Sequence, residues 1–235
     1  MPDSSAPLIH VIIPAYNEEQ SIAHVLAEIP VGLVAEVIVV DNNSGDKTAE
    51  VARAAGATVL RENRPGYGYA CLCGMTYSFD RPLAEQPAII VFLDGDYSDY
   101  PAEMRAVVAP LLRDEADMVI GSRALGERES GSMMPQQIFG NWLATNLLNR
   151  LYGVRYTDLG PFRAIRAEAL KKLRMEDKTY GWTVEMQLKA AKHHLRTQEV
   201  PVRYRRRIGV SKVSGTVKGT LGAGYKILWT IFKYL

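Results

Sequence analysis

The stretch IIVFLDGDYSDYPAE, residues 89–103, decides how the rest of the chain is interpreted. Residues 89–93 are all apolar, and a run this short with β-prone side chains is typical of a strand buried on both faces. Three carboxylates follow at once, those of Asp94, Asp96 and Asp99. Ligands of open α/β sheets bind at the carboxyl ends of strands, so this position favours a binding site.

Three interpretations of these acids compete. Asp99 can be the N-cap of a helix that begins near Pro101, and we expect that role for it, but capping leaves Asp94 and Asp96 unexplained. A calcium loop counted from Asp94 puts Asp99 where Gly is needed and Arg105 where a bidentate Glu is needed, which excludes that site. The remaining hypothesis is a divalent ion held by Asp94 and Asp96 together with phosphate oxygens of a ligand.

The composition is that of an ordinary globular protein and excludes few functions. The 235 residues are 47% hydrophobic and 23% charged, and they fit one large domain or one domain with an appendage. The formal net charge of +2 is too small to indicate nucleic acid as a partner on electrostatic grounds. Cys71 and Cys73 are too close for a zinc knuckle or a redox motif, so we expect two reduced thiols. The N-terminal segment lacks the features of a signal peptide, and we expect a cytoplasmic protein.

The alternation of strand and helix patterns predicts the fold. Apolar runs predict strands at 8–13, 36–40, 58–60, 88–93 and 117–122, separated by helical patterns at 18–29, 47–56, 68–79 and 102–112. This order predicts an α/β fold, a Rossmann-like three-layer sandwich with a mainly parallel central sheet. Residues 124–136 are predicted to form a lid-like loop, followed by a helix at 137–153, strands at 162–166 and 197–204, and a helix at 183–194. The predicted division is one domain over 1–215 and an amphipathic helix over 216–235.

The C-terminal helix has two interpretations, and both stay open. Val217, Leu221, Leu228, Ile231, Phe232 and Leu235 share one arc, Lys218, Lys226 and Lys233 share another, and Trp229 lies between. A basic amphipathic helix with Trp at its edge can lie at the headgroup level, which predicts peripheral contact with the inner face of a membrane. The alternative is a helix packed on the core of its own domain. No run reaches the roughly 20 apolar residues of a membrane span.

Two further strand ends carry polar residues that point to the same crevice. Pro14, Tyr16 and Glu18 follow the first strand, and Asp41 and Asn43 follow the second. The carboxyl ends of parallel strands meet at one edge, so these groups are predicted to converge with Asp94. Taken alone, residues 41–46 could equally form an N-cap and a turn. Neither a Walker loop nor a dinucleotide fingerprint is present, so a nucleotide would be held by side chains and metal.

These segments resemble a known family. VIIPAYNEE (11–19), VIVVDNNSGDKT (37–48), FLDGDYSDYP (92–101) and VIGSR (119–123) are similar to family-2 inverting glycosyltransferases with a GT-A fold. TDLGPFRAIRAEAL (157–170), TYGWTVEMQLKA (179–190) and RYRRRIGVSKVSG (203–215) resemble the dolichyl-phosphate mannose or glucose synthase-like branch. The resemblance covers nearly the whole chain.

The resemblance implies a donor site and its residues. It implies that Asp94 and Asp96 bind Mg²⁺ or Mn²⁺ on the diphosphate of a nucleotide sugar. The implied nucleotide-binding and substrate-binding set is Pro14, Tyr16, Glu18, Asp41, Asn43, Gly68, Asp94, Gly95, Arg123 and Ser211. The chain departs from the family pattern at Asn42 and Asn43, where Asp and Gly are usual, and at Ser98, where archaeal relatives can offer Gln to the metal.

The acceptor decides the catalytic residues. A hydroxyl acceptor needs a general base, for which Asp158 and Glu185 are candidates, although Asp158 is as readily a structural cap. A phosphate acceptor is already anionic and needs only cationic positioning, for which Arg123, Arg206 and Lys212 are candidates, with Arg163 as a further one. The catalytic set is therefore predicted to be Asp96, Arg206 and Lys212, with Asp158 and Glu185 as weaker members.

The expected activity is metal-dependent, inverting transfer of a hexose from a nucleoside-diphosphate sugar to a polyprenyl phosphate. One alternative is a soluble phosphorylated or hydroxyl acceptor, as for glucosyl-phosphoglycerate synthase-like enzymes. Another is a catalytically silent module that only binds a nucleotide sugar. Assembly as a homo-oligomer is left open.

Overall fold

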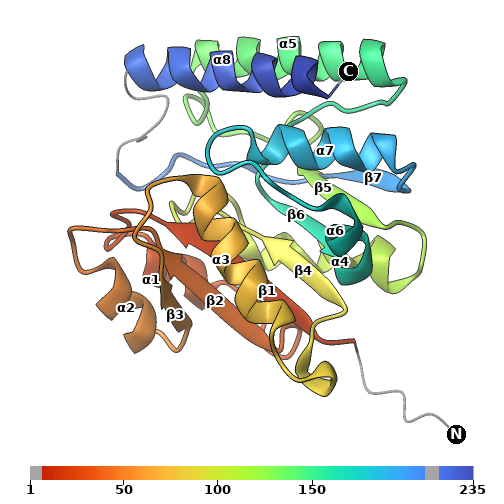
Figure 1. Cartoon of the computed structure of the whole chain (residues 1–235). Helices are drawn as coiled ribbons and strands as arrows, with labels where there is room; N and C mark the ends of the chain where they lie inside the picture. Colours follow the sequence, from red (N-terminus) through yellow and green to blue (C-terminus); the bar gives the residue numbers. More distant parts are fainter. Residues whose placement is uncertain (1–6, 210–216, 235) are drawn as a thin grey trace, which may run out of the picture.

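A central seven-stranded sheet forms the middle of the molecule (Figure 1). The computed structural model describes residues 7–209 and 217–234, with side chains from residue 222 onward in the second range. The strands are β1 (Ile9–Ala15), β2 (Glu36–Asp41), β3 (Thr58–Arg61), β4 (Ile89–Phe92), β5 (Met118–Ser122), β6 (Arg163–Arg166) and β7 (Thr197–Pro201).

The sheet is mainly parallel, as predicted. Its order is β3-β2-β1-β4-β6-β5-β7. β1 pairs in parallel with β2 and β4, β2 with β3, and β5 with β7, whereas β6 runs antiparallel to both β4 and β5. Because β1, β2 and β4 run in the same direction, the loops that follow them leave the sheet at one edge.

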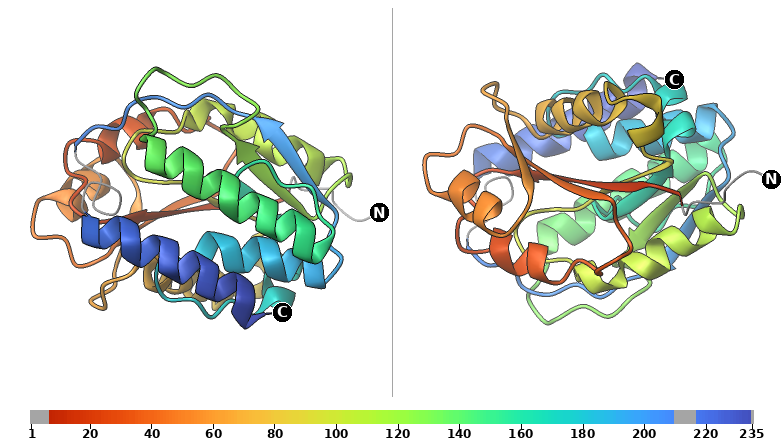
Figure 2. Two further views of the ribbon diagram at one scale, coloured as in Figure 1. Left: turned by 90° about the horizontal axis from the view of Figure 1, so that it is seen from above. Right: turned by 90° about the horizontal axis from the view of Figure 1, so that it is seen from below.

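Helices cover both faces of this sheet, which gives the predicted three layers (Figure 2). Side chains along β1 alternate: Ile12 packs with residues of α3 and α7, while Val11 and Ile13 pack with residues of α1 and α4. The helices are α1 (Ile22–Ala27), α2 (Thr48–Ala54), α3 (Tyr67–Phe79), α4 (Met104–Leu112), α5 (Pro135–Tyr152), α6 (Ala167–Leu173), α7 (Trp182–Lys192) and α8 (Val217–Lys233), with 3₁₀ turns η1 (Leu83–Glu85) and η2 (Pro101–Glu103).

The C-terminal helix α8 lies beside α5 and against α7, on the outside of one helical layer (Figures 1 and 2). Ile231 is fully buried in the core, and its carbonyl accepts a hydrogen bond of 2.9 Å from the Tyr152 hydroxyl. Trp229 and Phe232, in contrast, are both more than half exposed. The predicted apolar arc is therefore divided, since Ile231 packs on the domain and Phe232 does not.

Candidate active site

A cavity of about 570 Å³ opens where the carboxyl ends of β1, β2 and β4 meet. Its lining contains most of the residues that the sequence predicts for the donor site: Pro14, Tyr16, Glu18, Asn43, Asp94, Gly95, Asp96 and Arg123. The cavity continues past Gln136 and Gly140 of α5 to Ala223 and Gly224 of α8. One open space thus joins the strand ends to the seam between these two helices.

Asp94 and Asp96 have the environment of a metal-binding pair. The Tyr67 hydroxyl donates a hydrogen bond of 3.0 Å to Asp94 Oδ1. Burial, together with the charge of Asp96, raises the pKa of Asp94 to about 6, so this site favours a cation. Ser98 donates to Asp96 Oδ1 from its amide (2.9 Å) and from its hydroxyl (2.5 Å), which orients that carboxylate.

These two carboxylates fit a hard divalent ion whose shell is completed elsewhere. In the part of the chain that the structure describes, no group of three or more His, Cys, Asp or Glu side chains could hold a metal. An ion at Asp94 and Asp96 would take its other ligands from water and from the oxygens of a bound diphosphate, which is the usual arrangement for Mg²⁺.

The prediction that Asp99 caps a helix is wrong. The turn η2 begins after Tyr100 without a side-chain cap. Asp99 instead forms an isolated antiparallel backbone bridge with Tyr204. Its carboxyl group is buried, and neither oxygen has a hydrogen-bond partner among the described residues. Burial, reinforced by Asp94, raises the pKa of Asp99 well above its usual value.

The side of the cavity that is predicted to hold the nucleotide contains Asn42, one of the departures from the family pattern. Its side-chain amide donates to the carbonyls of Glu62 (3.2 Å) and Arg64 (2.8 Å), and its oxygen accepts from the amide of Gly66 (2.8 Å). These bonds tie the loop after β3 to the end of β2. Asn43 has φ +64°, a left-handed conformation that Asn tolerates and that Gly adopts freely.

Asp41 and Gly68 do not line the cavity, although the sequence predicts both for the donor site. The Asp41 carboxylate is fully buried, where it pairs with Arg61 and accepts from the amide of Ser44 (3.1 Å). A Cβ at Gly68 would lie 2.0 Å from the carbonyl oxygen of Asp177, so this position permits close packing of α3 on the loop before α7. Both residues shape the rim of the site in this structure.

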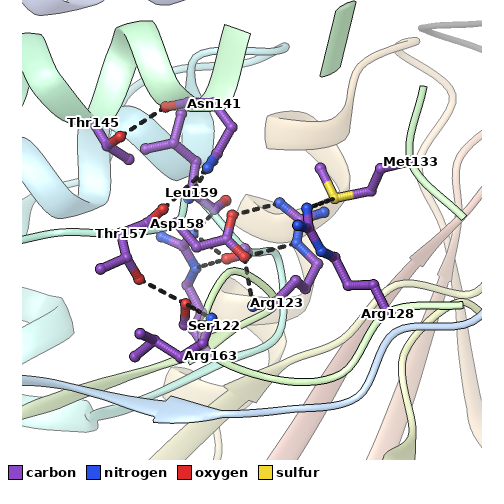
Figure 3. Close-up of polar contacts among 12 residues, drawn as sticks. Ser122, Arg123, Arg128, Met133, Asn141, Thr145, Thr157, Asp158, Leu159 and Arg163 are labelled. Atoms are coloured by element: carbon purple, nitrogen blue, oxygen red, sulfur yellow. Dashed lines mark hydrogen bonds and ion pairs between the residues drawn. The ribbon is translucent and has the colours of Figure 1, made fainter. Parts of the chain in front are cut away.

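Arg123 is held in the cavity by Asp158 (Figure 3). Its Nε and Nη2 donate to Asp158 Oδ2 and Oδ1 at 2.8 and 2.7 Å, and its amide donates to Oδ2 at 2.7 Å. Burial alone would raise the pKa of Asp158, but the charge and hydrogen bonds of Arg123 outweigh it and lower that pKa. Asp158 itself lines a smaller neighbouring cavity of about 300 Å³.

Arg163 supports the Asp158 loop from beneath. It is fully buried and donates to the carbonyls of Leu159 (3.1 Å), Gly160 (3.1 Å) and Thr183 (3.0 Å). Burial lowers the pKa of Arg163 to about 10. This side chain therefore braces the loop against the start of α7 and is not presented to the cavity.

Glu185 lies away from the cavity, inside the contact between α7 and α8. Lys189 Nζ is 2.7 Å from Glu185 Oε1, the amide of Asp177 donates to Oε2 at 2.7 Å, and the Tyr234 hydroxyl donates to Oε1 at 3.0 Å. The amide of Glu176 also donates to this carboxylate. The structure does not bring it together with the other predicted catalytic groups.

Within the segment 203–207, the arginine that enters the cavity is Arg207 and not the predicted Arg206. The predicted residue, Arg206, is exposed, and its Nε donates to the carbonyl of Ser130 at 2.7 Å. Arg207 lines the cavity, and its Nη1 is 2.8 Å from Asp96 Oδ2. The other two predicted residues of this segment, Ser211 and Lys212, lie outside the described residues.

Comparison with known proteins agrees with this geometry. The model of glycosyl transferase family 2 matches residues 10–174. An uncharacterized glycosyltransferase of Mycobacterium tuberculosis is 36% identical over 215 residues, covering 91% of this chain and 93% of that protein. A dolichyl-phosphate hexose transferase of Haloferax volcanii is 32% identical over 206 residues, covering 86% of this chain and 85% of that protein.

The fold is also shared with an enzyme of known structure. Glucosyl-3-phosphoglycerate synthase from Mycobacterium tuberculosis, in complex with Mn²⁺, uridine diphosphate and phosphoglyceric acid, superimposes with a TM-score of 0.77 at 24% identity, over 97% of this chain and 78% of that chain. This likeness establishes the expected GT-A architecture. With the family match over most of the sheet and the polar strand ends gathered at one cavity, the chain belongs to glycosyl transferase family 2.

Proposed function

We propose that this glycosyltransferase transfers a hexose, with inversion and with a divalent ion, from a nucleoside-diphosphate sugar to a polyprenyl phosphate. One observation carries the choice of acceptor. Both candidate general bases are occupied: Asp158 by a bidentate contact with Arg123, and Glu185 by Lys189 and backbone amides. A phosphate oxygen is already anionic and attacks without losing a proton, so a site in which both of these candidate bases are engaged suits it.

The roles of the chain's residues follow from their positions. Asp94 and Asp96 would hold the ion, and Tyr67 orients Asp94 through its hydrogen bond. A divalent ion in this position neutralises the charge that develops on the departing diphosphate. Arg123, fixed by Asp158, presents a rigid guanidinium group for the acceptor phosphate.

The extension of the cavity supports a lipid as the rest of the acceptor. From Arg123 the cavity leads to Gly140 on α5 and Gly224 on α8, where a Cβ on either glycine would meet nothing within 4 Å. An isoprenoid chain is apolar and slender, and this seam offers it a route to the outer surface of the two helices. The exposed side chains of these two helices that are named here the α5–α8 face are Ile138, Phe139, Trp142, Tyr225, Trp229 and Phe232.

An exposed aromatic and aliphatic face of this kind is suited to the headgroup region of a bilayer. No helix in the described ranges combines the length and apolar character that a membrane crossing requires. We therefore propose that contact with the membrane is peripheral, through the α5–α8 face, and that it delivers the acceptor to the cavity.

The test is a matrix of radiolabelled nucleotide sugars and acceptors with Mg²⁺ or Mn²⁺. The acceptors are a short-chain polyprenyl phosphate, the matching free alcohol and phosphoglyceric acid, with Asp96→Ala as the inactive control. We expect transfer to the polyprenyl phosphate alone. Transfer to phosphoglyceric acid or to the alcohol instead would overturn the acceptor, and nucleotide-sugar binding without any transfer would favour the silent binding module.

A further inference from the structure

Arg207 contacts the carboxylate that a metal ion would need. Its Nη1 lies 2.8 Å from Asp96 Oδ2, while the other oxygen of Asp96 accepts from Ser98. Both oxygens of Asp96 are therefore engaged, one by neutral donors and one by a full positive charge. A divalent ion that joins this carboxylate while the guanidinium group is in contact with Oδ2 is repelled by it, because the two cations compete for the same carboxylate.

We propose that Arg207 is the resident counter-ion of the metal site, and that it leaves Asp96 for the diphosphate when metal and nucleotide bind together. The inference rests on the proposed metal-dependent donor site. In this arrangement the metal alone binds poorly, since it must displace the guanidinium group that already neutralises Asp96. A diphosphate supplies that anion, because its oxygens accept charge-assisted hydrogen bonds from Arg207.

The backbone around Arg207 restricts the movement to its side chain. The amide of Arg205 donates to the carbonyl of Ser98 at 2.9 Å, and the amide of Ile208 donates to the carbonyl of Asp96 at 3.0 Å. These bonds hold the segment on both sides of Arg207 against the loop that carries Asp96. The guanidinium group can rotate from the carboxylate into the cavity that it lines, while its Cα stays in place.

The proposal predicts a coupling with a defined sign. A bound diphosphate draws Arg207 away from Asp96, which frees this carboxylate for the metal, and a bound metal frees Arg207 for the diphosphate. Each ligand should therefore strengthen binding of the other by the same factor. Removing the charge of residue 207 should raise affinity for the metal alone and lower affinity for the diphosphate. A residue with a merely structural role would weaken both.

The first measurement is binding of Mn²⁺ without nucleotide, from the electron paramagnetic resonance signal of the free ion. We expect Arg207→Gln to bind Mn²⁺ about tenfold more tightly than the unmodified enzyme, the scale of losing one nearby cation. Arg203→Gln is the matched control, because Arg203 belongs to the same segment but is paired with Glu103 on the surface. It makes the same change in net charge and should leave Mn²⁺ affinity unchanged.

The second measurement is calorimetric binding of UDP, with GDP as a second probe, at saturating Mn²⁺. Arg207→Gln should bind UDP about tenfold more weakly than the unmodified enzyme does. Arg207→Lys, which keeps the charge, should have affinities between those of Arg207→Gln and the unmodified enzyme in both experiments. Equal Mn²⁺ affinity of Arg207→Gln, Arg203→Gln and the unmodified enzyme would overturn the inference. Failure of the unmodified enzyme to bind either nucleotide with Mn²⁺ would instead overturn the donor site itself.

Discussion

At the scale of single residues, Asn42 shows why a departure from the family pattern changes the chemistry of the site. A carboxylate can accept hydrogen bonds but cannot donate them, whereas Asn42 donates to two carbonyls and accepts from one amide. The usual Asp at this position could not close the loop from β3 to Gly66 in the same way. The loop at the nucleotide side of the cavity thus depends on a carboxamide.

Asn42→Asp is therefore expected to weaken both the fold and nucleotide binding. The variant would place a charged group against the carbonyls of Glu62 and Arg64, and a buried polar group without its partner costs about 1–3 kcal/mol. Urea denaturation should report this loss, and calorimetry with UDP and Mn²⁺ should report weaker binding. Asn43→Gly is the control: it restores the other family residue at a position with φ +64° and should keep stability. A stable Asn42→Asp enzyme would show that the loop closes without these bonds.

The sequence predicts, from strand direction alone, that Pro14, Asn43 and Asp94 lie at one edge of the sheet, and all three line the cavity. It could not separate Arg206 from Arg207, since adjacent arginines in a loop carry no periodic signal. It also could not locate Glu185. Its pairing with Lys189 has the i,i+4 spacing of one helix, but its contact with Tyr234 forms only because α8 packs on α7. Contacts between segments distant in sequence decide these roles.

At the scale of elements, the strand and helix pattern predicted the layers but not the whole topology. Periodicity indicates which side of an element is buried, and the alternation along β1 matches it. The sequence does not indicate that β6 lies antiparallel between β4 and β5, because a short apolar run is compatible with either strand direction. The long connection through α5 that permits this reversal is a tertiary feature.

The packing of β1 on α3 makes stability depend on pH through His10. Its side chain is buried, with Nδ1 3.1 Å from the Ser78 hydroxyl. Burial lowers the pKa of His10, partly opposed by the charge of Glu36. Below about pH 6.5, His10 therefore binds a proton in the unfolded chain but not in the folded chain. The free energy of unfolding that this residue contributes is fully present above about pH 6.5 and decreases as the pH falls below it.

Urea denaturation of the unmodified protein and of His10→Gln between pH 8 and pH 5 isolates this contribution, because residue 10 of the variant cannot titrate. The difference in stability between the two proteins should change with pH, by at most about 1.4 kcal/mol per pH unit for one proton. Asp94 and Asp99, whose raised pKa values act in the opposite direction, are present in both proteins. The same pH dependence in both proteins would contradict this role of His10.

The seam between α5 and α8 can be tested with two glycines of one helix. Gly224 lines the cavity, whereas Gly222 is exposed outside it, and a Cβ at either would meet nothing within 4 Å. Gly224→Leu should fill the seam and lower transfer to a long-chain polyprenyl phosphate, while a short-chain acceptor and UDP binding are preserved. Gly222→Leu carries the same change in volume and helix propensity and should be unaffected. Equal activity of the two variants with the long acceptor would remove the seam as its route.

At the scale of the whole molecule, the large apolar side chains near the start of α5 do not enter the core. Ile138, Phe139 and Trp142 are exposed, whereas Ala144 and Leu148 of the same helix are buried in the core. On α8, Tyr225, Trp229 and Phe232 follow each other at spacings of four and three residues and lie on one exposed stripe. The exposed residues of α5 and the stripe on α8 belong to neighbouring helices, so the α5–α8 face forms only when these two helices pack together.

A whole-molecule prediction follows for membrane binding. We expect the protein to sediment with anionic liposomes, and the double variant Trp142→Ser/Trp229→Ser to lose most of this binding, because it removes one interfacial aromatic from each helix of the face. Leu83→Ser/Val31→Ser is the matched control, since both side chains are at least 85% exposed and lie outside that face. Binding that is lost equally in both double variants would indicate nonspecific hydrophobic adsorption. If the unmodified protein stays in the supernatant at low salt, the acceptor must reach the cavity from solution, and the α5–α8 face needs another occupant.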